Sequence, residues 1–318
     1  MSHGCGIAAR IVKRITYNGR KEPDRKTTDD ASSATVQRGT KDIYMQPIAF
    51  WKMNGSGNDF ILIDNRDGKI AEKDMKHLAE RSCRRRESIG ADGIIFIINS
   101  DRYDFAWRFF NADGSEAEMC GNGGRCVARF ANLNGIAGKS MTFDTLAGPI
   151  SAEVTDRIVK VLMPVPSGLK TDIGISFEPG WLSVDFINTG VPHVVVQVED
   201  LRNHPVFEHG RAIRYHSMFS PAGTNADFIK VKGPDSIELR TYERGVEDET
   251  LACGTGAIAS ALIANIRGIV SSPVRVATKG GEELKIYFHK EDDSFDDVWL
   301  EGSTSIVFKG EFFEEALI

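Results

Sequence analysis

The same short motif occurs twice in this 318-residue chain, and it strongly limits the possible folds. Cys-Gly-Asn-Gly occupies positions 120–123 and Cys-Gly-Thr-Gly occupies 253–256. Each motif follows an apolar strand-like run and opens a helix-like run; residues 256–266 are apolar on every side, and residues 127–133 nearly so. A helix without a polar face is buried. We therefore expect two related halves, each a sheet wrapped around one central helix, with both helix starts converging on one site.

Short strand-like segments dominate the rest of the sequence. They occur at 60–63, 94–98, 105–110, 141–144, 150–154 and 158–162, and again at 182–187, 194–198, 227–231, 237–242, 274–277, 284–288, 298–300 and 306–308. Helical spacing appears at 71–85, and the turn-forming residues 164–168 suggest a crossover between the halves. Closely spaced strands with few long helices favour an α+β fold with a mostly antiparallel or mixed sheet over a doubly wound parallel one.

The expected domain organisation follows from this repetition. We assign residues 47–163 to an N-terminal half, to which residues 305–318 return, and residues 164–304 to a C-terminal half. At 318 residues the chain is long enough for two cores of ordinary size.

Residues 1–46 have a different composition. They carry nine Lys/Arg and five Asp/Glu, are rich in Ser, Thr and Gly, and lack sustained periodicity, which is typical of disorder. We interpret them as an extension without a catalytic role. Two alternatives stay open: the basic amphipathic patch at 7–15 weakly resembles an organelle-targeting start, and translation could begin at Met45.

Composition excludes several classes of function. The formal net charge is −6 and the globular part has no basic stripe, so we expect no nucleic-acid partner. No apolar run approaches the roughly 20 residues that span a bilayer, so we expect no membrane association. The N-terminus lacks a secretory signal, and five cysteines without scaffold spacing indicate free thiols in the cytoplasm.

The position of Cys120 and Cys253 indicates acid–base chemistry. Unpaired N–H groups and the macrodipole make a helix start electropositive, which lowers a thiol pKa and attracts carboxylates. An amino-acid carboxylate between the two helix starts would place its α-carbon between the thiols. A thiolate on one face and a thiol on the other could then remove and return the α-proton, with backbone donors stabilising the developing charge. This chemistry needs no pyridoxal phosphate, and we expect no cofactor.

Structural explanations compete with the functional one. A lone Cys beside Gly is more often an inert core residue, but two in matched contexts favour function. Cys126 lies inside the first apolar helix and Cys83 outside both motifs, so we interpret both as structural. We expect no metal, because no second Cys/His pair with zinc-type spacing accompanies Cys120 and Cys126. The glycine-rich stretch also lacks the Lys-Ser/Thr of a phosphate-binding loop.

Four segments together resemble the diaminopimelate epimerase family over about residues 48–315. They are 53–60 (MNGSGNDF), 110–126 (FNADGSEAEMCGNGGRC), 242–245 (YERG) and 253–257 (CGTGA). The resemblance implies two pseudo-symmetric halves around central helices. It also implies a pyridoxal-phosphate-independent epimerase that interconverts LL- and meso-diaminopimelate in lysine biosynthesis, usually as a homodimer.

The resemblance also implies roles for individual residues. Cys120 and Cys253 match the acid–base pair. The predicted backbone clamp on the reacting carboxylate comprises Gly121, Asn122, Gly254 and Thr255. The predicted substrate-binding side chains are Asn58, Asn111, Asn225, Glu243 and Arg244; a second amino-acid head group needs Arg and Asn for its carboxylate and an acid for its ammonium. His193, with Glu243, matches a position thought to tune the thiol pKa values.

Two positions depart from the pattern. Some family members carry Asn where this chain has Val191 and Gln where it has Gly93, both at substrate-contacting positions. Those contacts are then absent or supplied by a neighbour such as Asn188. The segment from Glu243 to Cys253 is one residue longer than in some relatives.

Three alternative functions also stay open. They are a proline or hydroxyproline racemase, a Cys–His hydrolase using His193, and a binding module without catalysis.

Overall fold

Two similar series of strands and helices follow one another in the computed structural model, which describes residues 47–177 and 180–313. The first series comprises β1 (Ile48–Gly55), β2 (Asn58–Asp64), α1 (Glu72–Ser82), β3 (Gly93–Ile98), β4 (Phe105–Asn111), α2 (Gly121–Leu133), β5 (Ser140–Thr145), β6 (Gly148–Thr155) and β7 (Ile158–Leu162). The second comprises β8 (Ser167–Phe177), β9 (Gly180–Asn188), β10 (Pro192–Gln197), α3 (Val206–Arg214), the short 3-10 helix η1 (Ser217–Phe219), β11 (Asn225–Gly233), β12 (Ser236–Glu243), β13 (Asp248–Thr250), α4 (Gly254–Ile266), β14 (Val274–Thr278), β15 (Glu283–Glu291), β16 (Ser294–Ser303) and β17 (Ser305–Phe312).

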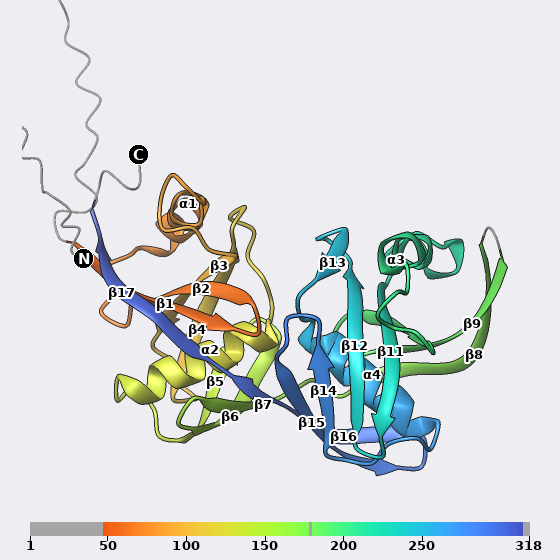
Figure 1. The fold of residues 1–318 in the computed structure, drawn as a ribbon. Coiled ribbons are helices and arrows are strands. Elements are labelled where there is room, and N and C mark those ends of the chain that lie inside the picture. The colour runs from red at the N-terminus through yellow and green to blue at the C-terminus, as the bar shows by residue number, and fades with distance from the viewer. Residues whose placement is uncertain (1–46, 178–179, 314–318) are drawn as a thin grey trace, which may run out of the picture. The chain divides into compact units, whose positions relative to one another are not determined.

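Apart from the short strand β13, which pairs with β12 and has no counterpart, strand pairing is the same in the two series (Figure 1). In the first, β1–β2, β3–β4, β5–β6 and β6–β7 are antiparallel, while β2–β3 and β4–β5 are parallel. In the second, β9–β10, β11–β12, β14–β15 and β15–β16 are antiparallel, while β10–β11 and β12–β14 are parallel. The antiparallel pair β7–β16 joins the two series, with Leu162 opposite Trp299. The predicted α+β fold of two related halves with a mixed sheet is confirmed.

The strand that follows each of the two matching units crosses to the other unit: β8 follows β7 and β17 follows β16. After β7 the chain enters β8, which pairs with β9, and after β16 it enters β17, which pairs with β1 from Ile48↔Phe312 to Asn54↔Ser305. In Figure 1, β17 runs from the end of β16 to lie beside β1. The domain boundaries expected from the sequence stay a prediction, and residues 1–46 lie outside the described part of the chain.

Each central sheet is covered by a helix on both faces. In β2, Phe60 and Leu62 join the core around α2, whereas Ile61 and Ile63 join a second core under α1. In β10, Val195 joins the α2–α4 core, whereas its neighbours pack in the core under α3. A strand buried on both faces has no polar side, which explains the unbroken apolar runs in the sequence.

The two central helices are buried along most of their length, as predicted from their sequences. The buried residues of α2 run from Asn122 to Ala131 with one interruption, and those of α4 run from Gly256 to Ala264. Leu300 of β16 lies between the two helix starts. A Cβ added at Gly121 would come within 2.9 Å of its Cδ2, and one at Gly254 within 3.0 Å. Glycine therefore permits both helices to begin this close to the same side chain.

Several elements were not predicted from the sequence, namely the strands β1, β8 and β13 and the helices α3 and η1. The nine-residue helix α3 was not expected; it contains Gly210, where an added Cβ would come within 2.3 Å of the Tyr242 Cβ. Because glycine disfavours helices, this short segment resembles a loop in the sequence, although its glycine is required by the contact with Tyr242. The expected crossover at 164–168 is shorter than predicted, because β8 already begins at Ser167.

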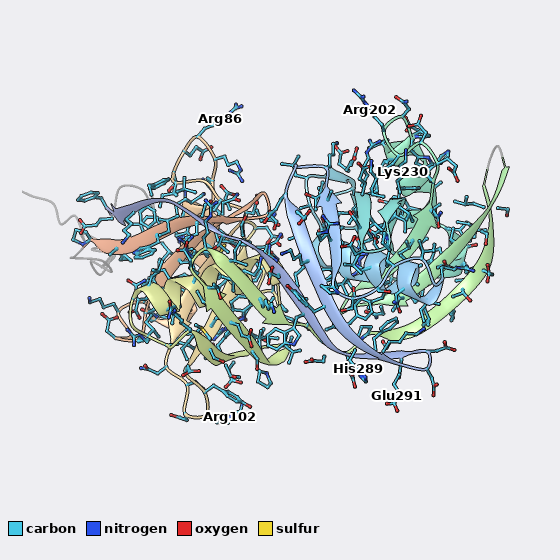
Figure 2. All side chains as sticks on the ribbon, turned by 60° about the horizontal axis from the view of Figure 1, so that its bottom comes forward. Arg86, Arg102, Arg202, Lys230, His289 and Glu291 are labelled. Carbon is cyan, nitrogen blue, oxygen red and sulfur yellow. The ribbon has the colours of Figure 1, made fainter. Side chains whose placement is uncertain are left out.

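Charged side chains mark the outer surface. Arg86, Arg102, Arg202 and Glu291 extend away from the ribbon in Figure 2. None of the helices in the described residues is both long and apolar enough to cross a membrane.

Candidate active site

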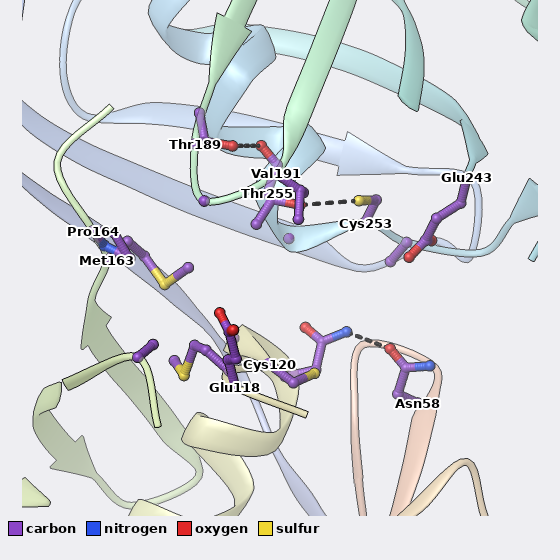
Figure 3. A pocket seen from close by; sticks show the side chains of 17 residues that line it. Asn58, Glu118, Cys120, Met163, Pro164, Thr189, Val191, Glu243, Cys253 and Thr255 are labelled. Atoms are coloured by element: carbon purple, nitrogen blue, oxygen red, sulfur yellow. Dashed lines mark hydrogen bonds between the residues drawn. The ribbon is translucent and has the colours of Figure 1, made fainter. Parts of the chain in front are cut away.

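A pocket of about 610 Å³ lies where the two central helices begin. Cys120 and Cys253 reach it from opposite sides in Figure 3. The other lining residues are Asn58, Glu118, Met119, Gly121, Asn122, Ala147, Met163, Pro164, Thr189, Gly190, Val191, Glu243, Ala252, Gly254 and Thr255. The pocket thus brings together residues up to 197 positions apart in the chain, from both series of strands.

Each cysteine is the N-cap residue of its helix. Cys120 precedes α2 in an extended conformation, and its Sγ accepts a hydrogen bond from the Gly123 N–H at 3.5 Å. Cys253 precedes α4 in the same conformation, and its Sγ lies 3.4 Å from the Thr255 Oγ1. Cys253 is only 6% exposed, whereas Cys120 is partly exposed. Both cysteines are free thiols.

The expectation of lowered thiol pKa values is wrong for this structure. Burial raises the pKa of Cys120 above its ordinary value, although the N–H groups of Gly123 and Asn122 and the charge of Arg125 oppose this increase. The pKa of Cys253 is raised well above 9.0, first by burial and then by the negative charges of Glu243 and Asp227. The electropositive helix start is outweighed because desolvation penalises a thiolate.

The two helix starts can hold an anion. Gly121 and Asn122 of α2 and Gly254 and Thr255 of α4 line the pocket, as the sequence predicted. N–H groups in the first turn of a helix have no partner within the helix, so they can donate to a ligand. The Thr255 carbonyl accepts a hydrogen bond from the Thr189 Oγ1 at 3.0 Å, which fixes the α4 start against the end of β9.

A buried His–Asp pair lies behind Cys253. The side chains of His193 and Asp227 are fully buried, with His193 Nδ1 2.6 Å from Asp227 Oδ2. The second carboxylate oxygen of Asp227 accepts from the Thr241 hydroxyl at 2.6 Å. His193 does not line the pocket, so its predicted effect on the thiols stays a prediction. Sequence reasoning missed Asp227; its only signal was an acid between the apolar residues Ala226 and Phe228.

Asn58 and Asn122 form a hydrogen-bonded pair at the other side of the pocket. The Asn122 Nδ2 donates to the Asn58 Oδ1 at 2.6 Å, and the Asn58 Nδ2 donates to Asp92 at 3.1 Å. The Asn122 Oδ1 accepts from the Arg125 Nη2 at 2.8 Å. Asp92 and Arg125 were not predicted, because nothing in the local sequence distinguishes their charges from surface charges.

Three predicted substrate contacts do not line the pocket in this structure. Asn225 is buried, and its Oδ1 accepts from the backbone N–H of Arg244 at 2.7 Å. The Arg244 guanidinium donates to the Ala222 carbonyl at 3.1 Å, and the Asn111 amide donates to Ser115 at 3.0 Å. Glu243 does line the pocket, and burial raises the pKa of its carboxyl.

The two departures from the family pattern have different structural settings. Val191 lines the pocket and places an apolar side chain there. Gly93 is buried in β3, where an added Cβ would come within 2.6 Å of a Phe109 ring carbon and 2.7 Å of the Phe110 carbonyl oxygen. A larger residue at 93 would thus require both β4 side chain and backbone to move. Asn188, the suggested substitute, instead accepts a hydrogen bond from the Gly190 N–H at 3.0 Å.

Other pocket residues were not singled out by the sequence. They include Glu118 and Met119, which precede Cys120, and Met163 and Pro164, which follow β7. In residues 47–177 and 180–313, no three His, Cys, Asp or Glu side chains gather where they could hold a metal ion.

The fold places the chain in a class of two-repeat proteins. It is similar to a crystal structure of a hydroxyproline epimerase from Agrobacterium vitis, with a TM-score of 0.61 and 14% identity over 86% of this chain and 94% of that one. It is also similar to a phenazine biosynthesis protein of the PhzF family from Bacillus anthracis, with a TM-score of 0.64 and 18% identity over 85% and 100% of the two chains. At these identities the likeness shows the fold.

Sequence comparison identifies the family within this class. The family model for diaminopimelate epimerase matches residues 50–167 and 186–305. A diaminopimelate epimerase of Aquifex aeolicus is 47% identical over 289 residues, which cover 85% of this chain and 99% of the relative. The chain therefore belongs to the diaminopimelate epimerase family, whose members are isomerases.

Proposed function

We propose that this protein interconverts LL- and meso-diaminopimelate in lysine biosynthesis, without pyridoxal phosphate, by using Cys120 and Cys253 as its acid–base pair. The observation that carries the proposal is the position of the two thiols. Each caps one of two buried helices, and both line the pocket that the helix starts share. Family membership supports diaminopimelate as the substrate.

In the proposed reaction, the carboxylate of the reacting centre binds between the two helix starts. The thiolate on one face takes the α-proton, and the electron pair left on carbon spreads into the carboxylate. Backbone N–H groups of Gly121, Asn122, Gly254 and Thr255 stabilise this charge as it develops. The thiol on the other face then donates its proton to carbon and becomes the thiolate, so the stereocentre is inverted and the two thiols exchange roles.

The substrate itself helps to create the thiolate. Both thiol pKa values are raised in the described structure, chiefly by burial. The α-ammonium of a bound substrate brings a positive charge into the same pocket, and a nearby positive charge favours the ionised form of a thiol. We therefore expect thiolate formation to be coupled to substrate binding.

The second head group of the substrate would lie beside Glu243, whose carboxylate can accept from an ammonium group. Asn225 holds the backbone N–H of Arg244, which follows Glu243, and we propose that this contact positions the Glu243 side chain. Asn58 lines the pocket directly. Asn111 and the Arg244 guanidinium would have to leave their present partners, Ser115 and Ala222, to reach the substrate.

The decisive experiment measures exchange of the α-hydrogen. The protein is incubated in D2O with LL-diaminopimelate or with L-proline, and deuterium incorporation is followed by NMR. We expect exchange with diaminopimelate alone and its loss in Cys120→Ala and Cys253→Ala. Cys126→Ala, which removes a fully buried thiol from the same helix, is the matched control and should retain exchange. Exchange that survives either of the first two substitutions would reject the two-thiol mechanism, and exchange of proline would favour a racemase.

We further propose that the enzyme is a cytoplasmic homodimer, as its family resemblance implies. Exposed apolar side chains at Val307 and Phe308 of β17 and at Phe313 offer area for self-association. Light scattering behind size exclusion should give twice the 35.0 kDa of one chain. A mass of one chain at micromolar concentration would contradict the proposed dimer.

A further inference from the structure

Arg125 is a buried cation in the second turn of α2. Its side chain is fully buried, and its Nη2 donates to two neutral groups, the Asn122 Oδ1 at 2.8 Å and the Ser56 hydroxyl. Its Nε and Nη1 have no hydrogen-bond acceptor among the described residues. The corresponding position of α4, counted from its cysteine, is Ile258. The two halves of the pocket therefore differ by one buried positive charge.

The surroundings of Arg125 contain few groups that could balance this charge. The ionisable groups that act on it are Glu282, which precedes β15, and the thiols of Cys126 and Cys120 on or beside its own helix. One carboxylate oxygen of Glu282 already accepts hydrogen bonds from the backbone N–H and the hydroxyl of Ser303, both at 3.0 Å. A buried charge is costly unless an opposite charge or hydrogen bonds compensate for it. A thiolate at Cys120 would supply such a charge at the pocket.

The hydrogen bonds of Arg125 also determine the orientation of two pocket amides. A guanidinium can only donate, so Asn122 must present its Oδ1 to Arg125 and its Nδ2 to Asn58. Asn58 accepts with its Oδ1 and donates with its Nδ2 to the carboxylate of Asp92, which is an acceptor when ionised. Arg125 and Asp92 thus fix the direction of this chain of hydrogen bonds at its two ends. One N–H of the Asn58 amide is left to donate to a ligand in the pocket.

We propose that Arg125 is a positioning residue for the proposed reaction, one that orients Asn122 and Asn58 and favours ionisation of Cys120 over that of Cys253. The charged groups around each thiol support this asymmetry. Burial raises the pKa of Cys120, the positive charge of Arg125 of α2 opposes this increase, and the negative charge of Glu243 of β12 adds to it. Burial and then the negative charges of Glu243 and Asp227 raise the pKa of Cys253, which caps α4. Among the leading influences on this pKa from the described residues, only hydrogen bonds from Thr255 and Gly256 oppose the increase, in contrast to the charge of Arg125 near Cys120.

The first test uses iodoacetamide alkylation at pH 7 without substrate, so it does not depend on the proposed function. Rates are measured for each cysteine by tandem mass spectrometry, which separates Cys120 from Cys126. In Arg125→Met the Cys120 rate should fall about tenfold, the effect of losing one nearby opposite charge. The Cys253 rate should not fall. Arg129→Met is the matched control: this arginine, one turn further along α2, donates to the backbone carbonyl of Thr304 and should leave both rates unchanged.

The second test separates charge from orientation with Arg125→Lys, which keeps the charge but loses the planar donor group. Its Cys120 alkylation rate should stay within about twofold of the original, while kcat/KM for diaminopimelate falls about 100-fold because Asn122 is displaced. Arg125→Lys also tests the positioning role if Arg125→Met does not fold. An unchanged Cys120 rate in folded Arg125→Met, or unchanged kcat/KM in Arg125→Lys, would overturn the inference. Absence of epimerisation by the original protein would instead refute the proposed function.

Discussion

Replacement of Gly256 by Ala would test how α4 packs against the buried His–Asp pair. A Cβ at this position would lie 2.4 Å from the Asp227 Oδ1 and 3.2 Å from the Thr241 Oγ1. Asp227 cannot move away freely, because its other oxygen is 2.6 Å from His193 Nδ1 and the whole side chain is fully buried. The extra methyl group must therefore displace the carboxylate or shift the start of α4.

The expected loss of stability follows from these contacts. Overpacking a well-packed interior costs about 1–3 kcal/mol. A displaced Asp227 would also weaken its hydrogen bonds to Thr241 and His193, and a bond to a charged group contributes about 1.5–3 kcal/mol. Replacing glycine by alanine inside a helix returns about 1 kcal/mol. We expect Gly256→Ala to lower the free energy of unfolding by about 3 kcal/mol.

The matched control is Gly123→Ala, at the corresponding position of α2. There the nearest atom to an added Cβ is the terminal methyl of Ile95, at 3.2 Å, which can adjust by a side-chain rotation. Urea denaturation followed by circular dichroism should show Gly256→Ala at least about 2 kcal/mol less stable than Gly123→Ala, since helix propensity changes equally in both. Equal stability of the two variants would refute the packing of Asp227 against α4.

Three further predictions concern charge and packing. Glu243→Gln should move alkylation of Cys253 to lower pH, because the Glu243 charge raises the pKa of that thiol; an unchanged pH profile would contradict this influence. Burial raises the pKa of Cys126 from 9.0 to about 12, so above pH 9 the unfolded state loses the proton first and stability falls with rising pH. In Cys126→Ala, urea denaturation should show the free energy of unfolding falling less steeply with pH, by roughly 1 kcal/mol per pH unit. The same slope in both proteins would contradict the raised pKa of Cys126. The added methyl group of Gly93→Ala would overlap the Phe109 ring, so this variant should lose about 2 kcal/mol of stability. Urea denaturation should show a lowered midpoint, and an unchanged midpoint would disprove the prediction.

Much of the fold was predictable because its signals are local. The apolar runs of β2 and β3 reflect burial on both faces, and the helices that follow Cys120 and Cys253 have no polar face. Helix α3 was missed because its glycine is required by a contact with Tyr242, 32 residues further along the chain. Likewise, the sequence did not indicate that β17 would pair with β1, beyond a general expectation that the C-terminal residues return to the first half.

In the candidate site, too, the features that depend on local sequence were predictable and those that depend on distant residues were not. The sequence by itself determined the two N-cap cysteines, the glycines behind them and the buried helices, because each depends on neighbours within one or two turns. Only the tertiary structure decided the thiol pKa values, the pairing of Asp227 with His193 and the contact of Arg125 with Asn122 and Ser56. Those properties depend on desolvation and on hydrogen bonds between elements, and a sequence does not state how deeply a charge is buried or which group faces it.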